Sequence, residues 1–241
     1  MSDVKKILIL NGSARGKASC TLTVAEEFAA GMSEANDYSV EVIHIAELRV
    51  TPCTGCLSCW AKEDGECVIR NDDIPLVKKK ILEADVVISA YPLYFFGMPG
   101  IMKTFTDRML GMMCTYKGQL PPENGESFHG LRYPMPGKKF ILVSSCAYTN
   151  AEAVFEPLLK QYDCICGRDN YTAILCPQLF TLVKAPSPSR IKRYYATIRE
   201  GGKLFAANGG LSGEELKKLS RPPFSEEVYK VLLDGYWQSR R

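Results

Sequence analysis

The chain has 241 residues, of which 46% are hydrophobic and 24% charged, so it can bury the core of one enlarged domain or two small ones. A net charge of +3 is too slight to predict a nucleic-acid partner, and no apolar stretch approaches the roughly 20 residues of a membrane span. Residues 1–6 lead directly into an apolar run rather than a signal peptide. Ten cysteines without a secretion signal predict that the protein lies in a reducing cytoplasm, where clustered thiols bind metal or do redox chemistry.

Apolar runs alternate with segments of helical spacing along most of the chain. The runs predict strands near residues 7–10, 38–45, 85–90, 140–143 and 171–176. Helices are predicted between them near residues 22–32, 74–81, 102–113 and 152–163. Each strand is a continuous apolar run, which favours an α/β fold with a doubly wound, five-stranded parallel sheet covered on both faces. We therefore expect a domain over residues 1–185 and a helical extension over 186–241, interrupted at Gly201-Gly202.

The loop between the first strand and the first helix, residues 11–21, has the composition of an anion site. Gly12 and Gly16 allow tight turns, and free amides at the helix start add donors and partial positive charge. The remaining hydroxyls and cations are Ser13, Ser19, Thr21, Arg15 and Lys17. One interpretation is an ordinary turn in which Ser19 caps the helix. The other is a monophosphate site, because the glycine spacings of dinucleotide and nucleotide loops are absent.

The loop after the third strand, residues 91–100, is rigid and apolar. Two prolines and two glycines restrict it, and it carries Leu93, Tyr94, Phe95, Phe96 and Met98. These side chains either pack in a core or dimer contact, or form a platform for a flat heteroaromatic ring. If the strand order is 2-1-3-4-5, this loop meets the first one at the switch point of the sheet. A ring beside a monophosphate is what FMN offers.

Three motifs in this order resemble the NADPH-dependent FMN reductase family, whose members are flavodoxin-like oxidoreductases. They are Gly12-Ser13-Ala14-Arg15 with Ser19-x-Thr21-Leu22, Pro92 to Gly100, and Lys103-x-Phe105-x-Asp107-Arg108, and the resemblance covers roughly residues 4–176. It implies a flavodoxin-like fold in which Ser13, Arg15, Ser19, Cys20 and Thr21 hold the FMN phosphate. It also implies that Pro92, Leu93, Tyr94, Phe95, Phe96 and Gly97 border the isoalloxazine, which Ser144, Ser145 and Cys146 approach. Asp107 and Arg108 are expected to tie their helix to neighbouring loops.

Four cysteines, Cys53, Cys56, Cys59 and Cys67, follow one another at gaps of two, two and seven residues. Repeated C-x-x-C is a recurring way to ligate iron–sulfur clusters, whereas zinc usually takes two separated pairs. The arrangement resembles the iron–sulfur flavoproteins, relatives of the same family, and thereby implies a 4Fe-4S cluster on these four thiols. The alternative is a cysteine-rich lining of the flavin site without metal.

Together these features predict an FMN-dependent NAD(P)H oxidoreductase in which the flavin carries the hydride chemistry and no catalytic side chain is required. The expected acceptor is a small molecule: a quinone, a flavin, or a nitro or azo aromatic. The alternative is an iron–sulfur flavoprotein that carries electrons to and from ferredoxin-like partners; a regulatory protein on the same fold is a third possibility. The aromatic C-terminal extension packs either on its own subunit or over a partner's active site. We favour the second, and so expect a homodimer or homotetramer, with neither nucleic acid nor membrane as partner.

Overall fold

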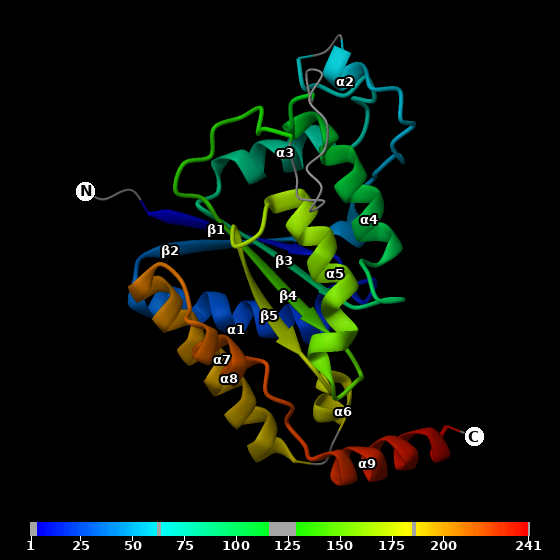
Figure 1. Ribbon diagram of the computed structural model, residues 1–241, viewed down its shortest axis with the longest axis vertical. Helices are drawn as coiled ribbons and strands as arrows, with labels where there is room; N and C mark the ends of the chain where they lie inside the picture. Colours follow the sequence, from blue (N-terminus) through cyan, green and yellow to red (C-terminus); the bar gives the residue numbers. More distant parts are fainter. Residues whose placement is uncertain (1–3, 62–63, 116–128, 185–186, 241) are drawn as a thin grey trace.

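The computed structural model describes residues 4–61, 64–115, 129–184 and 187–240. Its centre is a five-stranded, all-parallel sheet with the order β2-β1-β3-β4-β5 (Figure 1). The strands are β1 (Lys5–Asn11), β2 (Tyr38–His44), β3 (Val86–Pro92), β4 (Lys139–Ser145) and β5 (Tyr171–Cys176). The predicted strand order is confirmed. The order reverses between β1 and β3, so the loops that follow these two strands leave the sheet side by side.

Helices cover both faces of the sheet, because successive residues of each strand point to opposite sides. Ile7 and Ile9 of β1 belong to one buried cluster, and Leu8 and Leu10 belong to the other. The first cluster is covered by α1 (Cys20–Ala35), α6 (Leu179–Lys184), α7 (Pro188–Asn208), α8 (Gly213–Leu219) and α9 (Glu226–Gln238). The second is covered by α3 (Ile74–Glu83), α4 (Gly100–Asp107) and α5 (Ala151–Cys166). The doubly wound architecture is thus confirmed (Figure 1).

Short helices complete the connections. In the described part of residues 48–72, the cysteine-bearing segment, the single turn α2 (Ser58–Ala61) is the one helix. Three 3-10 turns follow β1, β2 and α4, namely η1 (Gly16–Ala18), η2 (Ile45–Glu47) and η3 (Arg108–Met112). A single helix is predicted over residues 102–113, but α4 ends at Asp107 and the chain continues as the 3-10 turn η3. The Arg108 side chain at the start of η3 donates to Asp72 of the cysteine-bearing segment. No helix in the described ranges is long and apolar enough to cross a bilayer.

The C-terminal extension packs on its own chain, with α7 lying along α1 (Figure 1). The predicted interruption at Gly201-Gly202 is wrong, because α7 continues through both residues. The glycines serve close contact instead: a Cβ atom at Gly202 would collide with the carbonyl of Phe28, and one at Gly31 with that of Arg199. Ile198 and Phe205 of α7 join the same buried cluster as α1, so the extension shares the core of the sheet domain.

The crossing of α1 and α7 predicts a large cost for a single methyl group. Gly202→Ala should lower the free energy of unfolding by about 1 to 3 kcal/mol, because overpacking against backbone outweighs alanine's higher helix propensity. Gly235→Ala is the matched control, because that α9 glycine has open space around it. This substitution should raise the free energy of unfolding by up to about 1 kcal/mol. Urea unfolding followed by circular dichroism measures both, and equal effects would contradict the close crossing.

Candidate functional site: the carboxyl edge of the sheet

The first turn is organised by Asn11, the last residue of β1, which is fully buried. Its Nδ2 donates to the carbonyl of Gly16 at 2.9 Å and lies 2.9 Å from Nδ1 of His44, while its Oδ1 accepts from the amide of Ser13. These bonds curl the loop back over the end of the sheet. Sequence reasoning missed this role of Asn11, which only its position at the end of the strand could have indicated. His44 has a structural role here, as a hydrogen-bond partner of the Asn11 side chain.

Backbone donors gather where α1 begins. Ser19 caps the helix by accepting from the amide of Leu22 at 3.2 Å, so the capping interpretation is confirmed. Capping leaves other groups free: within the described ranges, the amides of Cys20 and Thr21 have no protein acceptor. The side chains of Arg15 and Lys17 are exposed beside them. Free amides, a 16-residue helix dipole and two cations make this turn suitable for a phosphate.

Hydrogen bonds join this turn to the loops after β3 and β4. The hydroxyls of Thr21 and Ser145 lie 2.6 Å apart, and both residues are buried. The amide of Leu93 donates to the carbonyl of Ser145 at 2.8 Å, and the hydroxyl of Ser144 donates to the carbonyl of Tyr91. The three loops that the sequence singled out therefore meet at one edge of the sheet.

The aromatic loop ends in a tight hairpin. Tyr94 and Gly97 exchange two backbone hydrogen bonds of 3.0 Å, and the two residues between them have positive φ, +46° at Phe95 and +62° at Phe96. Such angles favour Asn or Gly and cost a phenylalanine roughly 1–2 kcal/mol. The turn places the Phe95 side chain entirely in solvent, whereas the Phe96 ring stacks on Tyr148 with ring centroids 6.3 Å apart. Tyr148 extends the aromatic platform from the loop after β4 and was missed by sequence reasoning.

Two cysteines that the resemblance assigns to the flavin site are partly or fully buried. Cys20 is partly buried and packs against the first hydrophobic cluster. Cys146 is buried, its Sγ is directed at the carbonyl of Tyr148, and burial raises its thiol pKa.

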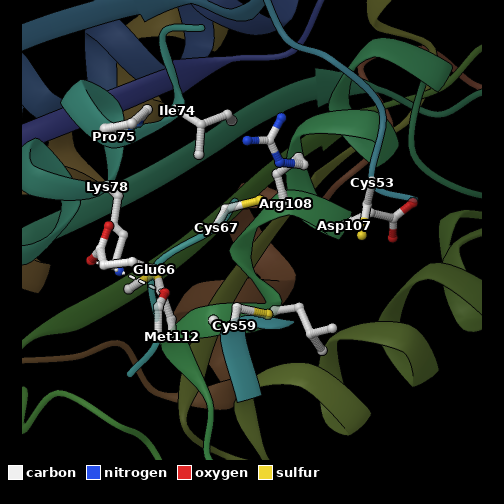
Figure 2. Close-up of a pocket in the computed structure, with 13 residues that line it drawn as sticks. Cys53, Cys59, Glu66, Cys67, Ile74, Pro75, Lys78, Asp107, Arg108 and Met112 are labelled. Atoms are coloured by element: carbon white, nitrogen blue, oxygen red, sulfur yellow. Dashed lines mark hydrogen bonds and ion pairs between the residues drawn. The ribbon is translucent and has the colours of Figure 1, made fainter. Parts of the chain in front are cut away.

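Three of the four clustered cysteines surround a small pocket against η3. Figure 2 shows Cys53, Cys59 and Cys67 with Lys78 and Arg108, and the Cys67 side chain points toward Arg108. Cys56 lies outside this lining, and both Cys53 and Cys56 are exposed. In the ranges that the structure covers, no three Cys, His, Asp or Glu residues are placed to hold a metal ion.

The chemistry of the four thiols suits a thiolate-bound cluster, and beside them Arg108 Nε is buried with no hydrogen-bond partner among the described residues. Their arrangement in the described structure does not suit one. The predicted metal set of Cys53, Cys56, Cys59 and Cys67 is not assembled, because the turn with Gly55 and Leu57 at positive φ leaves the first two thiols in solvent.

A buried ion pair fastens the cysteine-bearing segment to the sheet domain. Arg108 Nη1 donates to Asp72 Oδ2 at 2.5 Å and to the carbonyl of Thr51, and both charged side chains are completely buried. This confirms that Arg108 ties its helix to a neighbouring loop. Asp107 does not, since it pairs with Lys103 on its own helix at 2.5 Å.

The pKa of the Asp72 carboxyl is set by opposing causes. Burial tends to raise it, but hydrogen bonds from Arg108 and from the amides of Thr51 and Ile74 outweigh burial and hold this pKa below its ordinary value. Asp72 is therefore ionised at neutral pH, and its pairing with Arg108 stabilises the folded state there.

Comparison with known proteins identifies the family. A model described as flavodoxin-like fold matches residues 5–163, so the chain belongs to the flavodoxin-like family. It is 44% identical over 88 residues to an iron-sulfur flavoprotein of Archaeoglobus fulgidus, covering 36% of this chain and 39% of that protein. It is 37% identical over 103 residues to one of Methanocaldococcus jannaschii, covering 43% and 51%. The chain thus matches about half or less of the length of these relatives.

Solved structures share the fold at low sequence identity. An FMN-dependent NADH-azoreductase from Bacillus anthracis, in complex with FMN, superposes with a TM-score of 0.58 at 18% identity, over 84% of this chain and 99% of that one. An NAD(P)H:quinone oxidoreductase from Methanothermobacter marburgensis gives a TM-score of 0.59 at 17% identity, over 83% and 98%. At these identities the likeness supports the fold.

The strained hairpin predicts that a substitution can stabilise the flavin-free protein. Phe95→Asn should raise the free energy of unfolding by about 1 kcal/mol, because Asn tolerates positive φ and the exposed Phe95 ring loses no packing. Tyr94→Asn, at a neighbour outside the left-handed region, is the control and should not stabilise. Chemical denaturation of both variants tests this, and an unchanged or lowered value for Phe95→Asn would argue against strain.

Breaking the buried pair should be costly at neutral pH. Asp72→Asn leaves Arg108 charged and buried, so we expect a loss of about 3 to 5 kcal/mol in unfolding free energy at pH 7. Asp73→Asn removes a charge but keeps an amide oxygen that can accept from the Arg49 amide, so it should cost no more than about 1 kcal/mol.

The destabilisation caused by Asp72→Asn should depend on pH. A carboxyl with a lowered folded-state pKa stabilises above its unfolded pKa of about 3.9, and this stabilisation is lost as the pH falls through the folded value. The gap between wild type and Asp72→Asn should therefore narrow below about pH 4. A gap that stays constant from pH 7 to pH 3 would contradict the ionised pair.

Proposed function

We propose that this protein is an FMN-dependent NAD(P)H oxidoreductase that passes reducing equivalents from a nicotinamide to a small acceptor. The observation that carries the proposal is the meeting of three loops at the carboxyl edge of the sheet. Free amides and Arg15 lie on one side of this edge, and the hairpin of residues 94–97 lies on the other. FMN combines one phosphate with one flat ring, and both halves of the site match it.

Each part of the site has its own task in this proposal. Ser13, Arg15, Ser19, Cys20 and Thr21 form the loop that binds the phosphate, with the amides of Cys20 and Thr21 as its unused donors. The segment from Pro92 to Gly97 borders the isoalloxazine, and backbone groups of Ser144, Ser145 and Cys146 approach it from β4. FMN, when bound, supplies the hydride chemistry, while these residues orient it and keep water from one face of its ring.

The openness of the platform suits a broad choice of acceptor. Tyr94, Phe96 and Tyr148 are each about half exposed, at 49%, 47% and 54%, so flat molecules can stack over the same surface. We propose a quinone, a free flavin, or a nitro or azo aromatic as acceptor, in keeping with the azo and quinone reductases that share the fold. We also propose a homodimer or homotetramer, since Val231 and Trp237 expose apolar surface that subunit contacts bury.

A second candidate function is supported by the cysteine-bearing segment. Its four thiols within fifteen residues, and the iron-sulfur flavoprotein names of the matched relatives, favour an electron carrier with a 4Fe-4S cluster and ferredoxin-like partners. For that function Cys53 and Cys56 must turn inward from solvent to join Cys59 and Cys67. This candidate differs from the first in its electron donor and in its metal content.

One anaerobic experiment separates the two candidates. Protein purified without oxygen and supplied with FMN should bind one equivalent, and NADH or NADPH should bleach its absorbance near 450 nm. Addition of a quinone should then restore the colour over many cycles. If the protein is instead an electron carrier, we expect bound iron and sulfide, a stabilised semiquinone and no bleaching by either nicotinamide. Protein that binds no FMN would contradict both.

A further inference from the structure

We propose that Phe180, on α6, is a positioning residue for Arg15, and through Arg15 for the phosphate of FMN. Tyr236 of α9 holds the Phe180 ring in place, so the C-terminal extension supports the phosphate end of the flavin site. This inference rests on the proposed function, because it names what orients one of its phosphate-binding residues.

The contact that carries it lies beside the first turn. The Arg15 guanidinium carbon sits 5.8 Å from the centroid of the Phe180 ring, within the range of a cation–π interaction. The backbone of Arg15 is fixed by its amide, which donates to Ser13 Oγ at 3.3 Å. Its side chain is exposed and has no carboxylate partner in the described ranges. The ring of Phe180 is therefore the contact that restrains the guanidinium.

Phe180 is itself held from the other side. Its ring meets Tyr236 edge to face, with centroids 5.0 Å apart and planes at 89°. Tyr236 contacts Trp237 in the same manner, and the Arg240 guanidinium lies over the Tyr236 ring at 5.2 Å. A row of contacting side chains thus runs from α9 through α6 to the loop of residues 11–21, which is far from both helices in the sequence.

The position of α6 is fixed by the buried residue that precedes it. Gln178 donates from its amide to the carbonyl of Tyr148 and from Nε2 to Thr149 Oγ1, at 3.2 and 3.1 Å. Its Oε1 accepts from the amide of Phe224, just before α9, at 3.1 Å. Because these bonds tie α6 both to the loop after β4 and to the start of α9, Phe180 has little freedom to move away from Arg15.

The consequence is specific to the phosphate. Arginine has many rotamers, and a free guanidinium must be ordered when an anion binds. A ring that already restrains it lowers that ordering cost, so the gain appears only for ligands that carry the anion. FMN carries the phosphate and riboflavin lacks it, and the two share the same ring. Loss of Phe180 should therefore weaken FMN binding and leave riboflavin binding unchanged.

The test measures dissociation constants for FMN and riboflavin by quenching of flavin fluorescence in the full-length protein. Wild type should bind FMN more tightly than riboflavin, and Phe180→Leu should reduce this preference about two- to fivefold, the range of an exposed cation–π contact. Phe180→Tyr keeps an aromatic face and should restore the preference. In an Arg15→Gln background, Phe180→Leu should change the preference no further, because its effect passes through Arg15.

Tyr236→Leu is the second variant, since it leaves Arg15 and Phe180 in place and removes only the support of the ring. It should reduce the FMN preference, whereas Tyr236→Phe should not. Equal weakening of both flavins by Phe180→Leu and Tyr236→Leu, or an unchanged preference in both, would overturn the positioning role while leaving the proposed function intact. A wild type that binds FMN no better than riboflavin would instead remove the phosphate site itself.

Discussion

The site depends on one hydrogen bond between two buried hydroxyls, Thr21 Oγ1 and Ser145 Oγ, 2.6 Å apart. It spans the point where the strand order reverses and fastens the start of α1 to the end of β4. In a parallel sheet the carboxyl ends of all strands lie at one edge, but their loops can diverge from there. This bond, together with the bond from the Leu93 amide to the carbonyl of Ser145, links the free amides at the start of α1 to the aromatic hairpin.

The edge combines rigidity with local strain. Phe95 and Phe96 occupy backbone angles that suit neither, and Phe95 gains no packing in return. Such strain persists only where neighbouring structure enforces it. Here the enforcing contacts are the paired amides of Tyr94 and Gly97 and the prolines on either side, Pro92 and Pro99. A platform that exposes aromatic surface before any ligand arrives needs less reorganisation to bind one, and this suits an enzyme that exchanges donor and acceptor at one place.

The sheet and the meeting of its loops at one edge could be predicted from the sequence, because they depend on local patterns and on strand order. Continuous apolar runs marked the strands, and glycines, prolines and hydroxyls marked the loops. What failed depended on partners distant in sequence. The sequence pattern predicts a helix break at Gly201-Gly202, because it cannot show that Phe28 lies across the contact from Gly202. Asn11, Tyr148 and Phe180 carry no motif, and their roles follow only from the neighbours that the fold supplies.

The cysteine spacing illustrates the same limit, since spacing fixes how near thiols can come but not where they point. In the described structure the chain turns Cys53 and Cys56 into solvent, while Cys59 and Cys67 lie against η3 near the buried pair of Arg108 and Asp72. That pair and its bond to the carbonyl of Thr51 anchor the base of the segment to the sheet domain.

The central claim is that one edge of the sheet holds FMN, with its phosphate at the start of α1 and its ring on the hairpin. A crystal structure of the protein grown with FMN tests this most directly. We expect the phosphate within hydrogen-bond distance of the Cys20 and Thr21 amides and the isoalloxazine against residues 93–97. Flavin density at any other place, or none at saturating FMN, would contradict the account.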